Sequence, residues 1–399
     1  MGPLGGIRVV ELTHDHVAWA GKLLADLGAE VIVVEPPGGS PQRAYEPFAD
    51  DVPGPERSLW WWHYHTSKRG VVADLPADAD RLRALVADCD VFLEAERPGG
   101  LAAAGLDWET LREIAPRLIM VTITPFGSDS PRSHEPVTDL TVLAEAGPVW
   151  SCGYDDHSLP PVRGGGNQAL HTGGNWAVMA LLVALVAREE TGTGQHVDVN
   201  LHAASNVTTE MASYGWLMCE WEVQRQTGRH ATPQRTPPTQ VRCADGRYVN
   251  TGVLPRTPET FARLLELLDR LGLRDEFASS VILQLGAERD YLNVADIETD
   301  PLLAEILGAG RDVLWFLAEH LDAHRFFMET QRIGLATGVI RTPGEAIADP
   351  HFAARGFPVQ IEHPELGRTF TYPGAPYRFT RTPWAAGRAP LLGQHQELL

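Results

Sequence analysis

The sequence has few basic residues for its acidic content. It contains 33 lysines and arginines against 52 aspartates and glutamates, which gives a formal net charge of −19. Nucleic-acid binding depends on cationic side chains that neutralise phosphates, and anionic membrane surfaces attract the same side chains. The deficit therefore argues against both kinds of partner. A small anionic ligand remains compatible, because a few local cations and amide groups can hold one inside an acidic protein.

Cysteine is also scarce. The four cysteines are scattered along the chain, at Cys89, Cys152, Cys219 and Cys243. There is no CxxC pair and no histidine at ligand spacing from a cysteine. A disulfide framework or a zinc site is therefore disfavoured, and the pattern is typical of reduced core thiols in a cytoplasmic protein.

Long apolar runs are missing. The most apolar segment, residues 176–187, spans 12 residues, whereas a membrane-spanning helix needs about 20. We interpret this segment as a buried core helix. The first residues lead into a strand-like run without the charged and apolar regions of a signal peptide. The sequence therefore predicts a cytoplasmic protein with no membrane contact.

The composition is otherwise that of an ordinary globular protein, with 44% hydrophobic and 21% charged residues among 399. Strand-like runs alternate with helix-like ones, beginning with a strand at 7–12, a helix at 16–27 and a strand at 30–35. Further strands are predicted at 70–75, 90–94, 118–124 and 195–199, with helices at 78–88, 108–115 and 173–189. Such alternation predicts an α/β fold with one doubly wound parallel sheet and helices on both faces.

The pattern changes after about residue 205. Residues 225–245 are rich in Arg, Thr, Pro and Gln, which indicates a linker or an ordered loop. Residues 257–330 are mostly helical, and extended segments return after residue 335. We therefore predict a large domain at 1–224, a smaller helix-rich domain at 225–330, and a C-terminal segment at 331–399 that returns to the large domain.

Three clusters carry polar or aromatic groups that suit a site. Residues 13–16, Thr-His-Asp-His, follow the first strand, where open α/β sheets place their ligands. Metal binding there is disfavoured, because His14 and His16 are two residues apart and point in different directions. The glycines at 164–166 and 173–174 either let an anionic ligand approach the backbone amides of a helix start or form a plain turn. The aromatic run at 60–65 either stacks on an adenine or packs inside the protein.

Four stretches together resemble the class III CoA-transferase (CaiB/BaiF) family, which also includes the α-methylacyl-CoA racemases. They are the opening at 2–12 with its continuation at 23–39, Ser-Lys-Arg-Gly at 67–70, Glu-Ala-Glu-Arg-Pro-Gly at 94–99, and the tail at 388–395. Thr-Gly-Thr-Gly-Gln at 191–195 and Arg-Cys-Ala-Asp-Gly at 242–246 fall between them in the expected order. The resemblance covers nearly the whole chain.

The resemblance implies a Rossmann-like large domain, a small domain, and two interlocked subunits, as a homodimer or as a heterodimer with a homologue. It implies an acyl-CoA and a carboxylic acid as substrates, with coenzyme A as part of the substrate and no metal. Lys68, Arg69 and Arg97 are candidates to contact the CoA phosphates, since cationic groups form strong charge-assisted bonds to them. His16 is expected near the thioester end.

One position departs from the family. Its transferases use an aspartate just before the long helix, whose carboxylate attacks the thioester and forms an acyl anhydride. Counting back from residues 191–194 places that position at about Ala169, and residues 167–173 contain no acid. The racemases pair the same aspartate with a histidine, and Thr138 stands in the histidine's place. Racemisation is therefore disfavoured.

The remaining candidates for catalysis are Asp139, as a base or a replacement nucleophile, and His171, as a general base at neutral pH. Three hypotheses remain open. The chain is an enzyme that transfers CoA between carboxylic acids, or runs a diverged acyl-CoA reaction. Alternatively it is a non-catalytic CoA-binding subunit of a catalytic homologue, or the fold has been redirected to a ligand other than CoA.

Overall fold

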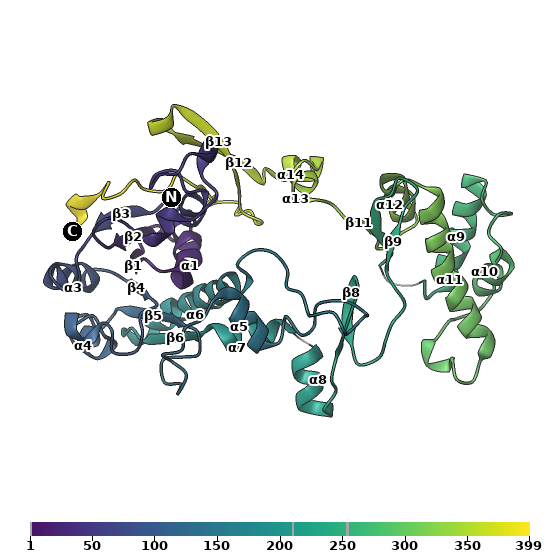
Figure 1. The fold of residues 1–399 in the computed structure, drawn as a ribbon, viewed down its shortest axis with the longest axis horizontal. Coiled ribbons are helices and arrows are strands. Elements are labelled where there is room, and N and C mark those ends of the chain that lie inside the picture. The colour runs from purple at the N-terminus through teal and green to yellow at the C-terminus, as the bar shows by residue number, and fades with distance from the viewer. Residues whose placement is uncertain (1, 210, 253–254) are drawn as a thin grey trace. The chain divides into compact units, whose positions relative to one another are not determined.

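A computed structural model of the protein describes residues 2–209, 211–252 and 255–399. Six parallel strands form its main sheet in the order β3-β2-β1-β4-β5-β6 (Figure 1). They are β1 (Arg8–Leu12), β2 (Glu30–Glu35), β3 (Arg69–Val72), β4 (Val91–Glu94), β5 (Ile119–Thr124) and β6 (His196–Asn200). This order reverses beside β1, so the predicted doubly wound α/β sheet is confirmed.

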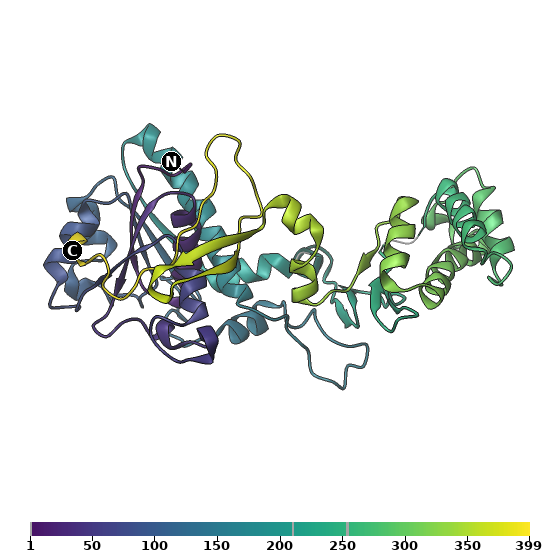
Figure 2. The same ribbon diagram turned by 90° about the horizontal axis from the view of Figure 1, so that it is seen from above.

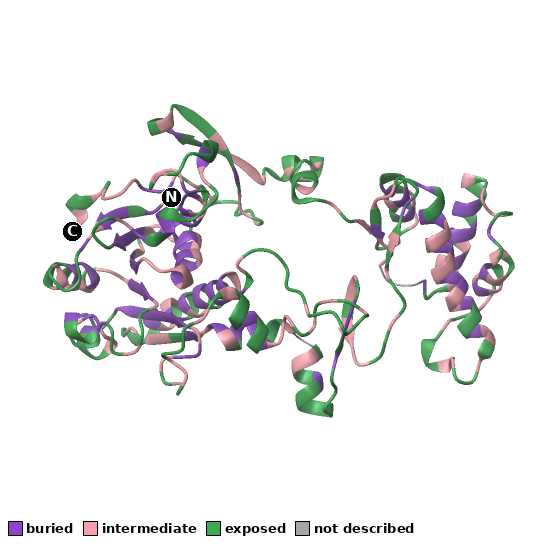
Figure 3. Ribbon diagram, viewed as in Figure 1, coloured by how far each residue is buried: buried purple, intermediate pink, exposed green. Residues whose placement is uncertain are grey.

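Helices cover both faces of this sheet. The helices packed in the same unit are α1 (Asp15–Asp26), α2 (Leu59–Tyr64), α3 (Ala79–Ala87), α4 (Trp108–Ile114), α5 (Asp139–Ala146), α6 (Gln168–Thr191), α7 (Leu201–Asn206), α8 (Met211–Cys219) and α14 (Pro350–Arg355). Helices α1 and α6 share one buried apolar cluster with the sheet, and α3 and α4 share another on the opposite face. Buried residues accordingly follow the strands and the inner sides of these helices (Figure 3).

The long helix α6 begins earlier than the sequence predicts. It has 24 residues and is long and apolar enough, by length and composition, to cross a membrane. Half of its most apolar window is buried, and residues such as Leu181 and Ala184 belong to the core around the sheet. This burial fits the predicted role of the segment as a core helix.

A second unit is formed by residues 154–156 and 224–348. Its helices are α9 (Pro258–Leu271), α10 (Ser280–Ala287), α11 (Pro301–His320), α12 (Ala323–Arg332) and α13 (Pro343–Ile347), and its strands are β7 (Gln224–Gln226), β8 (Arg229–Thr232), β9 (Gln240–Arg242), β10 (Tyr248–Asn250) and β11 (Gly338–Val339). Residues 331–348, which the sequence assigned to the C-terminal segment, group with this unit because β11 pairs with β10.

The end of the chain packs on the first unit. Strands β12 (Pro358–His363) and β13 (Arg368–Pro373) form a hairpin. Beyond it, the His395 amide donates to the Gly70 carbonyl at 2.9 Å, and the Ser67 amide donates to the Gly387 carbonyl at 3.0 Å. In Figures 1 and 2 this yellow segment lies beside the purple N-terminal elements. The first and last residues of the chain therefore belong to one core.

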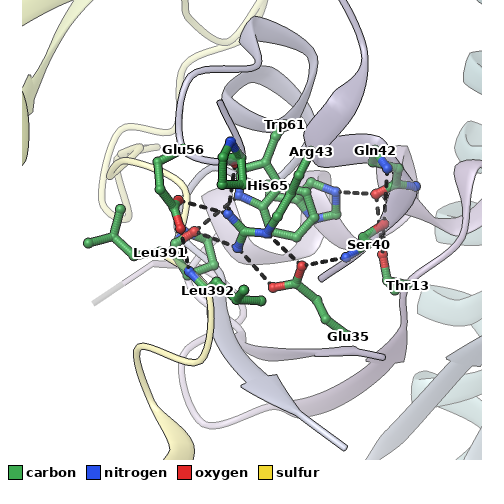
Figure 4. Close-up of polar contacts among 12 residues, drawn as sticks. Thr13, Glu35, Ser40, Gln42, Arg43, Glu56, Trp61, His65, Leu391 and Leu392 are labelled. Carbon is green, nitrogen blue, oxygen red and sulfur yellow. Dashed lines mark hydrogen bonds and ion pairs between the residues drawn. The ribbon is translucent and has the colours of Figure 1, made fainter. Parts of the chain in front are cut away.

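A buried ion pair joins the tail to β2 (Figure 4). The Arg43 guanidinium lies 2.6 Å from the Glu35 carboxylate, and both side chains are almost fully buried. Arg43 also donates to the Pro390 carbonyl at 3.1 Å and stacks on the Trp61 ring at 3.9 Å. A buried charge persists only when it is paired and hydrogen-bonded, and this network meets that condition.

Burial makes stability depend on pH through Glu94, which ends β4. Its carboxylate accepts hydrogen bonds from the Thr122 hydroxyl and the Glu96 amide, and desolvation raises its pKa from 4.5 to about 7. A raised carboxyl pKa contributes stability that is present below the unfolded pKa and is lost as pH rises through the folded one. We therefore expect Glu94→Gln to flatten the fall in unfolding free energy between about pH 4.5 and 7, by up to about 1.4 kcal/mol per pH unit.

Urea unfolding over that pH range checks this expectation. Glu109→Gln is the matched control, because the Glu109 side chain is 70% exposed and should leave the slope unchanged. A slope in the Glu94 variant equal to that of the unmodified protein would contradict the expectation.

Candidate active site at the start of helix α6

The first turn of α6 is capped by a residue from another helix. The Asp139 Oδ1 accepts a hydrogen bond from the Ala169 amide at 2.8 Å and a longer one from the Leu170 amide at 3.4 Å. The local N-cap residue, Asn167, makes no side-chain capping bond. Because free amides at a helix start favour an anion, Asp139 supplies the carboxylate that the neighbouring sequence lacks.

The other oxygen of this carboxylate is also occupied. Arg163 Nη1 lies 2.5 Å from the Asp139 Oδ2, and the Asp139 side chain is 11% exposed. Both oxygens of this carboxylate are therefore engaged, one by two amides and the other by a guanidinium. Attack on a thioester would require these bonds to be given up, so the geometry favours a structural role for Asp139 over the predicted role as a nucleophile.

Ala169 itself lies in the core. Its side chain is fully buried and belongs to the apolar cluster around α1, α6 and the sheet. At about the position where the resemblance places the family nucleophile, the chain therefore has a buried methyl group. Thr172, one turn further along the helix, donates its hydroxyl to the Gln168 carbonyl at 2.7 Å.

His171 faces a tyrosine from the aromatic run. The Tyr64 hydroxyl lies 2.7 Å from His171 Nε2 and accepts a hydrogen bond from the Asn167 side-chain amide at 3.1 Å. Burial lowers the pKa of His171, although the nearby Asp139 charge opposes this shift. His171 is therefore neutral at physiological pH, as the predicted general base would be.

An aromatic wall surrounds this pair. The Trp19 ring of α1 stacks on His171 with ring centroids 4.2 Å apart, and its indole N–H donates to the Asn175 side chain at 2.9 Å. Trp60 packs on Tyr64 at 4.2 Å between centroids. Most of the aromatic run thus lies in α2 and packs against neighbouring rings, which is the internal-packing alternative, while one member, Tyr64, contacts the candidate site.

His16 lies one helical turn before Trp19 on α1. Its Nδ1 is 3.3 Å from the Ile123 carbonyl, near the end of β5. Burial lowers its pKa to about 3, so its imidazole is neutral at physiological pH. Both α1 and α6 begin at the carboxyl edge of the sheet, where open α/β folds bind their ligands. The contact of His16 with a thioester stays a prediction.

Lys68 lies inside the protein. Its ammonium is 2.8 Å from both carboxylate oxygens of Glu11, and its side chain is fully buried. It also donates to the Ala18 carbonyl at 3.1 Å. The predicted contact with a CoA phosphate would require this pair to separate and leave Glu11 unpaired.

The two predicted arginines lie apart. The Arg69 guanidinium is 3.3 Å from the carboxylate of Glu30, the first residue of β2, and so it points toward the amino ends of the strands. Arg97 follows β4 at the carboxyl edge and is exposed. Among the described residues, no hydrogen bond or ion pair engages the Arg97 side chain. Its position favours Arg97 over Arg69 as a contact for a ligand at that edge.

Histidines and a capped helix start lie at the carboxyl edge of this doubly wound sheet, the edge at which open α/β folds bind their ligands. The model of CoA-transferase family III matches residues 4–396, and the chain belongs to this family. The resemblance found in the sequence is therefore confirmed. Members of the family are enzymes that act on acyl-CoA thioesters.

Named relatives support this assignment. A succinyl-CoA:(R)-benzylsuccinate CoA-transferase subunit, BbsE, from Thauera aromatica is 31% identical over 97% of this chain and 91% of its own length. A succinate–glutarate CoA-transferase from Agrobacterium fabrum is 31% identical over 99% of this chain and 94% of its own length. A CaiB/BaiF family protein from Brucella suis has a similar structure, with a TM-score of 0.78 and 28% identity over 99% and 98% of the two chains.

Sequence reasoning brought Asp139 and His171 to the same helix start but missed their partners. Tyr64 and Trp19 come from distant segments, and of these two Tyr64 carried a signal, as part of the aromatic run. Arg163 precedes a glycine-rich stretch that suggested an anion contact. The anion at the helix start is the protein's own Asp139.

Proposed function

We propose that this chain transfers CoA from an acyl-CoA to a carboxylic acid without an acyl intermediate on the protein, the acceptor's own carboxylate being the attacking group. Several relatives are named for succinyl-CoA as the donor, which makes a dicarboxylic donor the first choice. The observation that carries the proposal is the α6 start, where position 169 is a buried alanine and the nearest carboxylate is engaged.

The proposed steps balance without a further reactant. An acceptor carboxylate oxygen attacks the thioester carbon, the C–S bond breaks, and a mixed anhydride and CoA thiolate form. The thiolate then attacks the acceptor's carbonyl carbon, and the C–O bond of the anhydride breaks. The products are the acceptor's CoA thioester and the donor's carboxylate. Holding both acids in one site supplies the effective concentration that replaces a covalent intermediate.

Steady-state kinetics distinguishes this route from the family's covalent one. Direct attack needs donor and acceptor bound together, so double-reciprocal plots at several acceptor concentrations should intersect. A covalent intermediate on the protein gives ping-pong kinetics with parallel lines. Parallel lines with succinyl-CoA and a carboxylic acid would refute direct attack.

Replacing Asp139 tests the relocated nucleophile. Asp139→Asn keeps an oxygen that accepts from the Ala169 amide and removes the charge that pairs with Arg163. We expect the transfer rate to fall less than about tenfold, because the residue caps a helix, whereas losing a nucleophile costs about a thousandfold or more. Glu135→Gln, at an exposed ion pair with Arg132, is the control. A thousandfold loss with an unchanged unfolding curve would assign the nucleophile to Asp139.

A second candidate function follows from the Thauera relative, whose name describes one subunit of a transferase. Here the chain binds CoA or a homologue while a partner chain carries the catalytic aspartate. The buried Ala169 favours this candidate as well. Turnover of any CoA ester by the purified chain alone would exclude it, and activity only after a homologous chain is added would support it.

The remaining parts of the proposal concern assembly and ligand contacts. We infer an interlocked dimer, with itself or with a homologue, in the cytoplasm. Arg97, Arg69 and His16 are the proposed contacts for CoA, with the phosphates near the arginines and the thioester near His16. Lys68 is a weaker candidate because of its pair with Glu11.

A further inference from the structure

We propose that His171 is a hydrogen-bond donor, through Nδ1–H, to the carbonyl oxygen of the reacting thioester, and that Tyr64 is the residue that fixes this tautomer. The proposal rests on the CoA transfer proposed above and changes the role of His171 from a base to a donor. It begins with the hydrogen bonds that Tyr64 makes.

The Tyr64 oxygen has one donor that is not ambiguous. The side-chain amide of Asn167 donates to it at 3.1 Å, so an oxygen lone pair is occupied and the phenol proton needs an acceptor. The nearest candidate is His171 Nε2 at 2.7 Å. A neutral imidazole accepts through one nitrogen and donates through the other. When Nε2 accepts from Tyr64, the proton of His171 must be on Nδ1.

This Nδ1–H has no hydrogen-bond partner among the residues that the structure describes. The ring is only half-buried, and Nε2 makes its one side-chain hydrogen bond. Because Nε2 accepts from a phenol whose pKa is raised by burial, it is not available to remove a proton from substrate. The role that remains for the His171 side chain is to donate a hydrogen bond through Nδ1–H.

The ring is held in place on a second side. The Trp19 indole stacks on it at 21° between planes, and the indole N–H is anchored on Asn175. A donor contributes most to catalysis when it is fixed before the reaction and directed at developing charge. In the proposed transfer, the thioester oxygen gains negative charge in the first step and the carbonyl oxygen of the attacked anhydride gains it in the second. A neutral imidazole stabilises such charge without giving up its proton.

The titratable and charged groups near His171 are consistent with a neutral ring. Asp139 of α5 raises its pKa and burial lowers it, with burial the larger cause. His63 of α2 is itself held neutral by burial, with its pKa lowered to about 3. Tyr64, also of α2, keeps its proton because burial raises its pKa.

The tautomer is measured directly by NMR on protein with 13C- and 15N-labelled histidine, with His171 assigned from the His171→Gln variant. We expect the Nδ1–H form in the free protein and a shift toward Nε2–H in Tyr64→Phe. The matched control is Tyr372→Phe, since the Tyr372 hydroxyl lies 2.8 Å from His363 Nε2 in the C-terminal hairpin. It should change His363 and leave His171 unaltered. An Nε2–H form of His171 in the unmodified protein would overturn the assignment.

Ligand binding and kinetics test the donor role. Succinyl-CoA should shift the His171 Nδ1 resonance and free CoA should not. His171→Gln should lower kcat by about a hundredfold or more with little change in KM, and Tyr64→Phe by about two- to tenfold. A base gives an acid limb in the rate at its own pKa, whereas a hydrogen-bond donor, which remains a donor when protonated, gives none.

The outcomes separate this proposal from the function on which it rests. Binding of succinyl-CoA with no response at Nδ1, or an acid limb that disappears in His171→Gln, overturns the donor role alone. Failure to bind any CoA ester in calorimetry overturns the donor role and the proposed function together. Even then, the tautomer of His171 in the free protein shows whether Tyr64 fixes the proton on Nδ1.

Discussion

Replacing Arg43 with alanine is expected to lower the free energy of unfolding by about 3–5 kcal/mol, the cost of removing one partner of a buried ion pair. Glu35 is fully buried and, among the residues that the structure describes, would keep a single hydrogen bond, from the Ser40 amide at 3.0 Å. The substitution also removes the contact with the Trp61 ring and the bond to the Pro390 carbonyl. The loss should therefore loosen the chain's last residues as well as β2.

Urea unfolding followed by tryptophan fluorescence measures this effect, and hydrogen exchange at the β2 amides locates it. Arg117→Ala is the control, because Arg117 pairs with Glu189 at 3.4 Å on the surface with side chains 56% and 72% exposed. Exposed pairs contribute about 0–1 kcal/mol. If Arg43→Ala cost no more than this control, the network of Figure 4 would not stabilise the fold as described.

Replacing Lys68 with methionine is expected to lower the unfolding free energy by about 3 kcal/mol and to leave CoA affinity unchanged. Methionine fills similar space but leaves the Glu11 carboxyl buried without its cation. Desolvation already raises the pKa of Glu11 to about 7 against the opposing effect of Lys68. Without Lys68 that pKa rises further, so Glu11 must be protonated to stay buried, and the cost grows as pH rises.

The variant to compare with Lys68→Met is Arg97→Ala, because Arg97 is exposed and lies at the carboxyl edge of the sheet. We expect it to weaken CoA binding about tenfold, with stronger loss at low salt, and to leave stability unchanged. Calorimetric titration with CoA and urea unfolding of both variants give the comparison. Weaker CoA binding by Lys68→Met, with normal stability, would restore Lys68 as a ligand contact.

The sheet was predictable because its strands are signalled locally. The runs at β1 and β2 are rich in valine and are buried on both faces, so they read as central parallel strands without any knowledge of their neighbours. Helix α2 was not predicted, because its tryptophans also fit a strand or a binding surface. The start of α6 was placed five residues late, since its cap is Asp139, which is distant in the sequence.

The site was predictable only in part, for the same reason. The absence of a carboxylate at position 169 could be read from the residues, and so could the candidates Asp139 and His171. That Asp139 is engaged by Arg163, and that His171 is held by Tyr64 and Trp19, depends on contacts between segments that only the fold brings together. Likewise, nothing in Ser-Lys-Arg-Gly at 67–70 distinguishes the buried Lys68 from the exposed Arg69.

The absence of a covalent intermediate is tested most directly by following oxygen in a single turnover. The chain is mixed with succinyl-CoA and an acceptor acid labelled with 18O in its carboxylate, and both the released succinate and the protein are analysed by mass spectrometry. Direct attack places one acceptor oxygen in the succinate and none in the protein. A covalent route through a carboxylate such as Asp139 leaves the first succinate unlabelled and transfers 18O to the protein. Labelled protein, or no transfer by the chain alone, would contradict the proposed mechanism.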